Sequence, residues 1–101
     1  MILVLTTVSK KPDAQKLAKG LIKSKFAACV NILKIEQSVY RWKGALKAEG
    51  EYLLLIKTGR PYRSVEQFIL KNHPYELPEI LQFRIRAGHR SYLNWILAQS
   101  R

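Results

Sequence analysis

Hydrophobic residues recur along this chain with two different periods. Over 12–25 and 62–72 they recur every three or four positions with polar residues between them, which predicts two amphipathic helices. Pro12 and Asp13 suit the start of the first helix, and Pro74 ends the second. Shorter apolar runs, rich in branched and aromatic residues, predict strands at 2–6, 26–33, 52–58 and 79–87.

Two further features complete the predicted order of elements. The second strand is predicted to continue through Tyr40 and Trp42 to a turn at Lys43-Gly44, and Ser91 is predicted to cap a short final helix. The resulting order is βαββαβ with a terminal helix. We therefore predict an α+β, ferredoxin-like fold in which right-handed crossovers place both helices on one face of an antiparallel sheet. One domain is expected to span 1–101.

The two strands at the centre of this fold, 2–6 and 52–58, are apolar on both faces. Along 52–58 both alternating sets of side chains are apolar, so neither face of that strand favours water. A lone chain would then expose a hydrophobic sheet face of a size that soluble monomers rarely show. We therefore expect a symmetric oligomer. The fourth strand alternates more cleanly and is predicted to point its apolar set inward: Leu81, Phe83, Ile85 and Ala87.

Composition adds a large positive charge to this picture. The chain has 101 residues, of which 48% are hydrophobic, and its 18 Lys and Arg against 7 Asp and Glu give a net charge of +11. A single cysteine excludes an internal disulfide and favours the cytoplasm. The apolar opening segment lacks the basic start and cleavage site of a signal peptide and is too short to span a bilayer, so no membrane partner is expected.

The positive charge raises the question of nucleic acid, because RNA-recognition modules share the βαββαβ order. Such modules stack bases on aromatic side chains of the third strand, but 52–58 is aliphatic apart from Tyr52. We therefore expect no specific nucleic-acid partner. Weak, nonspecific anion binding stays open, with most of the cations forming a solvated surface.

The densest group of chemically capable residues is the segment 73–79. It places an imidazole, a phenol and two carboxylates between two prolines, and imidazole with carboxylate suits a divalent ion such as zinc or copper. The same side chains equally suit local hydrogen bonds and pairing with the many cations. Cys29 is either a buried structural residue or a softer ligand. The candidate metal ligands are His73, Glu76 and Glu79, with Tyr75 beside them.

Aromatic residues outside this segment have two interpretations. Tyr40, Trp42, Tyr92 and Trp95 either line a pocket or belong to the core and subunit contacts. No nucleophile elbow, P-loop, dinucleotide-binding or zinc-protease motif is present, so an enzyme is the least favoured class.

Four blocks of this sequence, in their order, resemble the CutA family of divalent-cation tolerance proteins. They are Ala27-Ala28-Cys29-Val30-Asn31-Ile32, Tyr40-Arg41-Trp42-Lys43-Gly44, the segment 51–58 together with 73–79, and Tyr92-Leu93-Asn94-Trp95. The resemblance covers nearly the whole chain. It implies a ferredoxin-like protomer in a tight homotrimer, with the long second and third strands pairing across subunits.

The resemblance also implies copper or another divalent cation, with His73 as the carried-over ligand. Copper-binding members have a cysteine at the end of the first strand and a second histidine before His-Pro-Tyr, where this chain has Thr6 and Asn72. Metal binding is therefore expected to be weak, and no cofactor is required.

Two hypotheses follow from these residues. The first is a trimeric, non-catalytic protein of metal homeostasis whose subunit clefts are lined by His73, Tyr75, Glu76 and Glu79, with Trp42 and Lys57. The alternative is a trimeric anion or nucleotide sensor in which Lys57, Arg41 and Arg60 meet phosphate.

Overall fold

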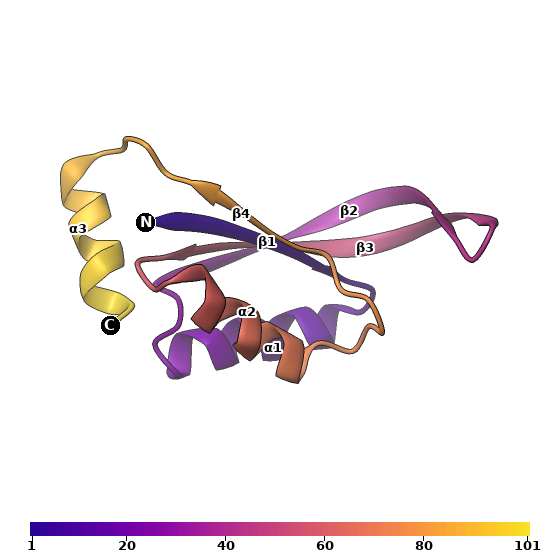
Figure 1. The fold of residues 1–101 in the computed structure, drawn as a ribbon, viewed down its shortest axis with the longest axis horizontal. Coiled ribbons are helices and arrows are strands. Elements are labelled where there is room, and N and C mark those ends of the chain that lie inside the picture. Colours follow the sequence, from indigo (N-terminus) through magenta and orange to yellow (C-terminus); the bar gives the residue numbers. More distant parts are fainter.

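The computed structural model describes residues 1–101 and has the predicted order of elements (Figure 1). The sheet order is β2-β3-β1-β4 with antiparallel pairing throughout, so β1 and β3 are the central strands, as predicted. Figure 1 shows α1 and α2 side by side on one face of the sheet, and α3 at the end where the N-terminus lies. The elements are β1 (Ile2–Val8), α1 (Lys11–Lys23), β2 (Cys29–Trp42), β3 (Ala45–Thr58), α2 (Tyr62–Asn72), β4 (Ile80–Arg84) and α3 (Arg90–Gln99).

The hydrophobic core lies between the sheet and the two helices. Alternate residues of β1 and β3, such as Val4 and Ile56, point toward the helices and are fully buried. They meet the apolar faces of the helices at Leu21 of α1 and Ile69 of α2. Burying side chains of this size contributes roughly 1.5–3 kcal/mol each, so this layer holds the protomer together.

The other face of the sheet carries apolar side chains that nothing in the chain covers. Leu5 lies opposite Leu55 on one side and Leu81 on the other, and Leu3 lies opposite Phe83. Leu81 is 49% exposed and Phe83 51% exposed. The prediction that Leu81 and Phe83 face inward is therefore wrong for a single chain. The alternation is present, but the register turns this set to the open face.

Several predicted boundaries also differ from the structure, among them the end of the first strand, which is Val8 instead of 6. The second strand starts at Cys29 rather than at 26, because the amides of Phe26 and Ala27 donate to the carbonyl of Leu21 at the end of α1. The third strand begins at 45 instead of 52, and the fourth ends at 84 instead of 87. Ser91 does not cap α3, which begins at Arg90 without a side-chain cap.

The strands β2 and β3 are the longest elements, and the hairpin that they form reaches well past the helices in Figure 1. Its two-residue turn is at the predicted Lys43-Gly44, where both residues have positive φ, as a type I′ turn requires. Farther down, Ile35 pairs with Glu51 but Ser38 pairs with Glu49, so β2 carries one extra residue. Such a bulge bends a hairpin and increases its twist. No helix of this structure is both long enough and apolar enough to cross a bilayer.

Thr6→Val is expected to stabilise the protein by about 1 kcal/mol. The Thr6 hydroxyl is fully buried and has no hydrogen-bond partner, and a buried unpaired polar group costs roughly 1–3 kcal/mol. Chemical denaturation at one fixed protein concentration measures the free energy of unfolding.

Thr58→Val is the matched control, because Thr58 is equally buried but its hydroxyl donates to the Phe26 carbonyl at 2.7 Å and accepts from the Arg60 amide at 2.9 Å. This variant should lose about 1–3 kcal/mol. Equal destabilisation by both substitutions would contradict the assignment of Thr6.

Candidate functional site

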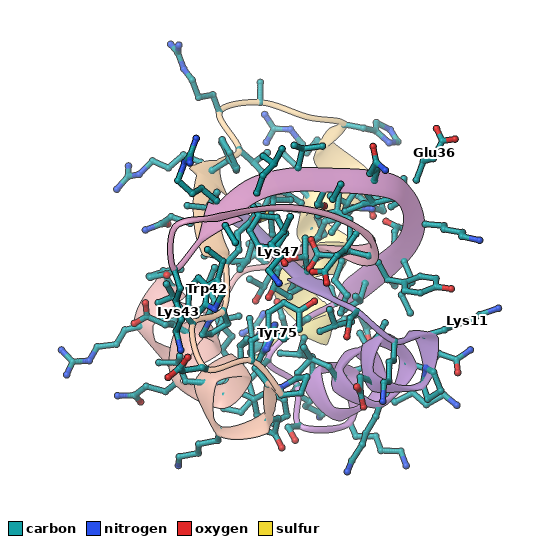
Figure 2. The ribbon with its side chains drawn as sticks, turned by 90° about the vertical axis from the view of Figure 1, so that its right-hand side faces the viewer. Lys11, Glu36, Trp42, Lys43, Lys47 and Tyr75 are labelled. Carbon is teal, nitrogen blue, oxygen red and sulfur yellow. The ribbon has the colours of Figure 1, made fainter.

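A cavity of about 810 Å³ opens at the end of the sheet from which the hairpin extends. Its walls come from the end of β1, the outer half of the hairpin and the loop 74–79. Figure 2 looks onto this end and shows the hairpin arching over it, with Trp42 and Lys43 to one side and Tyr75 below. The lining includes three aromatic rings and four carboxylates: Tyr40, Trp42, Tyr75, Glu49, Glu51, Glu76 and Glu79.

The bulge in β2 decides which hairpin side chains reach this cavity. Below the bulge, Leu33 and Ile35 lie opposite Leu53 and Glu51, on the open face of the sheet. A regular strand would continue this set through odd-numbered residues. The extra residue shifts the alternation, so that Tyr40 and Trp42 share a face with Glu49 and Glu51.

Two tyrosine–glutamate hydrogen bonds fix the carboxylates at the back of the cavity. The Tyr75 hydroxyl donates to Glu51 at 2.5 Å, and the Tyr40 hydroxyl donates to Glu49. Burial, reinforced by the hydrogen bond to Glu51, raises the pKa of Tyr75, and the hydrogen bond to Glu49 does the same to the pKa of Tyr40. Both phenols therefore stay protonated as donors at neutral pH. Glu51 is only 8% exposed, so its charge is held inside the protein wall.

The cavity is acidic in a strongly basic protein. Four of the seven carboxylates of the chain line it, and no Lys or Arg does. The only ion pair lies at its rim, where Lys43 Nζ and Glu76 Oε2 are 4.0 Å apart and both side chains are largely exposed. An exposed pair of this kind contributes little, so the cavity favours positive charge.

His73 anchors the loop rather than lining the cavity. Its Nε2 donates to the Thr7 carbonyl at 2.8 Å, and its Nδ1 accepts from the Tyr75 amide at 3.1 Å. A neutral imidazole satisfies both contacts at once. Burial lowers the pKa of His73, and this outweighs the opposite effects of the Thr7 hydrogen bond, Glu51 and Asp13.

The predicted metal set is not assembled within one chain. No group of three His, Cys, Asp or Glu residues lies close enough together to hold a metal ion. Glu76 and Glu79 line the cavity as predicted, but both ring nitrogens of His73 are occupied. Coordination by His73 would have to replace one of these hydrogen bonds, and it stays a prediction.

Tyr75 and Trp42 line the cavity as predicted, but Lys57 does not. Lys57 Nζ bonds Asn31 Oδ1 at 2.5 Å and lies 3.9 Å from the Cys29 sulfur, on the open face. It is six residues along β3 from Glu51, roughly 20 Å away. Cys29, a partly exposed free cysteine, is likewise remote from the loop 73–79.

The residues of the predicted anion site are also separate within one chain. Arg60 lies over the Phe26 ring at 5.1 Å and donates to the Lys25 carbonyl. Arg41 is on the hairpin, twelve residues along β2 from Cys29, the pairing partner of Lys57. Tyr92 and Trp95 stack on each other on α3 and take no part in the cavity.

Glu49 and Glu51 are the cavity residues that the sequence analysis missed. Both stand in Glu49-Gly50-Glu51, ahead of the apolar run at 52–58. Two carboxylates at strand spacing point to one face of a sheet, which is an unusual pairing in so basic a chain. Extending the third strand back to the turn would have placed them beside Tyr40.

Comparisons with known proteins give one family over the whole chain. The sequence model of the CutA1 divalent ion tolerance protein family matches residues 2–99. The divalent-cation tolerance protein CutA of Thermus thermophilus is 39% identical over 94 residues, covering 92% of this chain and 91% of that protein. The chloroplastic protein CutA of Arabidopsis thaliana is 36% identical over 101 residues, which are 99% of this chain but 56% of that protein.

Solved structures agree with the sequence matches. CutA1 from Pyrococcus horikoshii superposes with a TM-score of 0.95 at 28% identity, covering 100% of this chain and 99% of that one. The PII-like protein CutA from Nostoc superposes with a TM-score of 0.92 at 29% identity, covering 100% of this chain and 98% of that one. The periplasmic divalent cation tolerance protein CutA from Archaeoglobus fulgidus gives 0.94 at 30% identity, covering both chains completely. Because these proteins include chloroplastic and periplasmic ones, the cytoplasmic location stays a prediction.

His73 is expected to make the protein less stable as the pH falls below about 6.5. The unfolded histidine takes up a proton near its ordinary pKa of about 6.5, whereas the folded one does so only at lower pH. The unfolded state therefore binds more protons in this window, and stability falls until the folded pKa is reached. Denaturant unfolding between pH 7.5 and 5.5 measures this slope.

His73→Gln should flatten the slope whatever it does to absolute stability. His89→Gln is the matched control, because His89 is the other histidine of the chain and is exposed. It should leave the slope unchanged. The same slope in wild type and His73→Gln would show that His73 does not carry the effect.

Proposed function

Since this chain belongs to the CutA1 divalent ion tolerance protein family, we propose that it acts as a non-catalytic homotrimer in the response to divalent metal ions. Its acidic cavity would hold a cation weakly, in a cleft that a neighbouring subunit helps to close. The observation that carries the proposal is the concentration of four carboxylates in the lining of a cavity that includes no Lys or Arg.

The uncovered sheet face supports assembly. Leu5, Leu55, Leu81 and Phe83 form an apolar surface across three strands, and Leu33 of β2, 45% exposed, extends this surface. Removing such surface from water contributes about 25 cal/mol per Å². Copies arranged around a symmetry axis can turn these faces toward one another, so a closed ring would cover every face. The number three comes from the family resemblance.

Local charge rather than net charge governs cation binding in the cavity. At physiological ionic strength interactions between exposed charges are screened beyond roughly 8 Å, so the distant cations that give +11 weigh little there. The donors on offer are carboxylate oxygens, which bind copper and zinc less tightly than thiolates and imidazoles do. We therefore assign the ligand role to Glu76 and Glu79, with Glu49 and Glu51 supplying negative charge. His73 joins them only by giving up a hydrogen bond.

The geometry favours this function over the anion or nucleotide sensor. A phosphate entering the cavity would face four carboxylates, and the one cation paired with them, Lys43, lies at the rim. The three basic residues proposed for phosphate, Lys57, Arg41 and Arg60, do not converge within a chain.

Glu76→Gln/Glu79→Gln is expected to weaken divalent-metal binding roughly tenfold or more, which corresponds to about 1.4 kcal/mol. The change keeps the side-chain shape but removes two negative charges from the cavity. Isothermal titration calorimetry with Cu²⁺ and Zn²⁺ measures the affinities in wild type and variant.

Glu36→Gln/Glu66→Gln has the same net charge and is the matched control, because neither residue lines the cavity. It should bind as wild type does. Unchanged affinity in Glu76→Gln/Glu79→Gln, or equal losses in both variants, would reject the cavity as the metal site.

A further inference from the structure

The clustering of carboxylates around the cavity leaves the rest of the surface strongly cationic. Outside the cavity there are 18 Lys and Arg against 3 carboxylates. We refer to 10–25 and 60–71, which contain α1 and α2, as the helix layer. This layer is the clearest case, because it holds nine Lys and Arg and only two carboxylates, Asp13 and Glu66. No Lys or Arg of this layer is within ion-pair distance of a carboxylate.

One side of α1 presents three of these cations as a row. Lys16, Lys19 and Lys23 are all exposed and lie three and four residues apart, on the side of the helix opposite the buried Leu17 and Leu21. We refer to these three residues as the lysine face. They line one shallow groove of about 430 Å³, whose other residues are Pro12, Gln15 and Gly20. In Figure 2, Lys11 also projects into solvent from the start of the same helix.

The lysine face lies on the side of the protomer away from the open sheet face. Because α1 and α2 cover one side of the sheet and the uncovered leucines lie on the other, assembly through the open face leaves the lysine face free. The surface therefore remains accessible in an oligomer, and its charge has no partner within the chain.

We propose that the lysine face binds the phosphate backbone of double-stranded nucleic acid without reading its sequence. The three lysines extend over roughly 10 Å of helix at 1.5 Å per residue. That length corresponds to about three phosphates of one strand of a duplex, at 3.4 Å each along its axis. Contacts to phosphate alone carry no sequence information, so unrelated duplex sequences should bind alike.

Two other polyanions fit the lysine face less well. Single strands are held by aromatic side chains on which bases stack, and no aromatic ring lines the groove. Membrane-surface helices insert large apolar side chains beside their lysines, and the groove has none. The proposal does not depend on metal binding in the cavity, and neither result decides the other.

The test is a fluorescence-anisotropy titration of a labelled 20-base-pair DNA duplex with the full chain at several salt concentrations. We expect two unrelated duplex sequences to bind equally, with log affinity falling linearly against log salt. Lys16→Gln/Lys19→Gln/Lys23→Gln should reduce the magnitude of the slope by about 2.7, since each lost phosphate contact contributes about 0.9. Circular dichroism checks that the variant is folded.

Arg84→Gln/Arg86→Gln/Arg90→Gln loses the same charge from exposed positions outside the helix layer and is the matched control. The lysine-face variant should lose at least tenfold more affinity than this control at 100 mM salt. Equal losses would assign binding to net charge and overturn the proposal. So would a wild-type slope smaller than 1 in magnitude, or tighter binding to vesicles of phosphatidylcholine with 30% phosphatidylserine than to the duplex.

Discussion

The sheet of this protein has two apolar faces and only enough helix to cover one of them. Val4 and Ile56 are sealed beneath α1 and α2, while their neighbours Leu5 and Leu55 point the other way. The same constraint sets the register of β4, which turns Leu81 and Phe83 toward the uncovered side. A surface of this kind is stable in water only when another surface like it removes it from solvent. This constraint is the physical basis of the proposed oligomer.

The cavity depends on three local devices at the end of that sheet. The bulge in β2 turns Tyr40 and Trp42 toward Glu49 and Glu51, and His73 bonds β1 through Nε2 and the Tyr75 amide of the loop through Nδ1. Tyr75 then reaches the buried carboxylate of Glu51. Each device is a neutral hydrogen-bonded group or a backbone irregularity, so none of them adds a positive charge, and the carboxylates of the cavity are paired only by Lys43 at the rim.

Opposite charges are segregated on the surface of this protein. Carboxylates collect at the cavity and cations cover the helix layer, so one chain offers a small anionic site and a broad cationic surface. Because charges separated by more than a Debye length are largely screened, the two regions act independently at physiological salt. The net charge alone explains neither the acidic cavity nor the cationic helix layer.

The fold was predictable from the sequence because its strongest signals are periodic. Helical spacing located α1 and α2, two-sided apolar strands indicated the centre of the sheet, and Lys43-Gly44 marked the turn. The site was only partly predictable. Glu76, Glu79, Tyr75 and Trp42 were found by residue type, but Glu49 and Glu51 were missed because the third strand was predicted to begin only at 52. The occupation of both His73 nitrogens depends on a contact 66 residues apart in the sequence.

The most direct test of the account is the mass of the folded particle in solution, measured by sedimentation for wild type, Phe83→Glu and Leu70→Glu. Phe83 lies on the open face, whereas Leu70 is 53% exposed on α2 and serves as the matched control. We predict three times the 11.7 kDa chain mass for wild type and Leu70→Glu, and dissociation or misfolding for Phe83→Glu. Well-folded single chains of wild type at micromolar concentration would contradict the account.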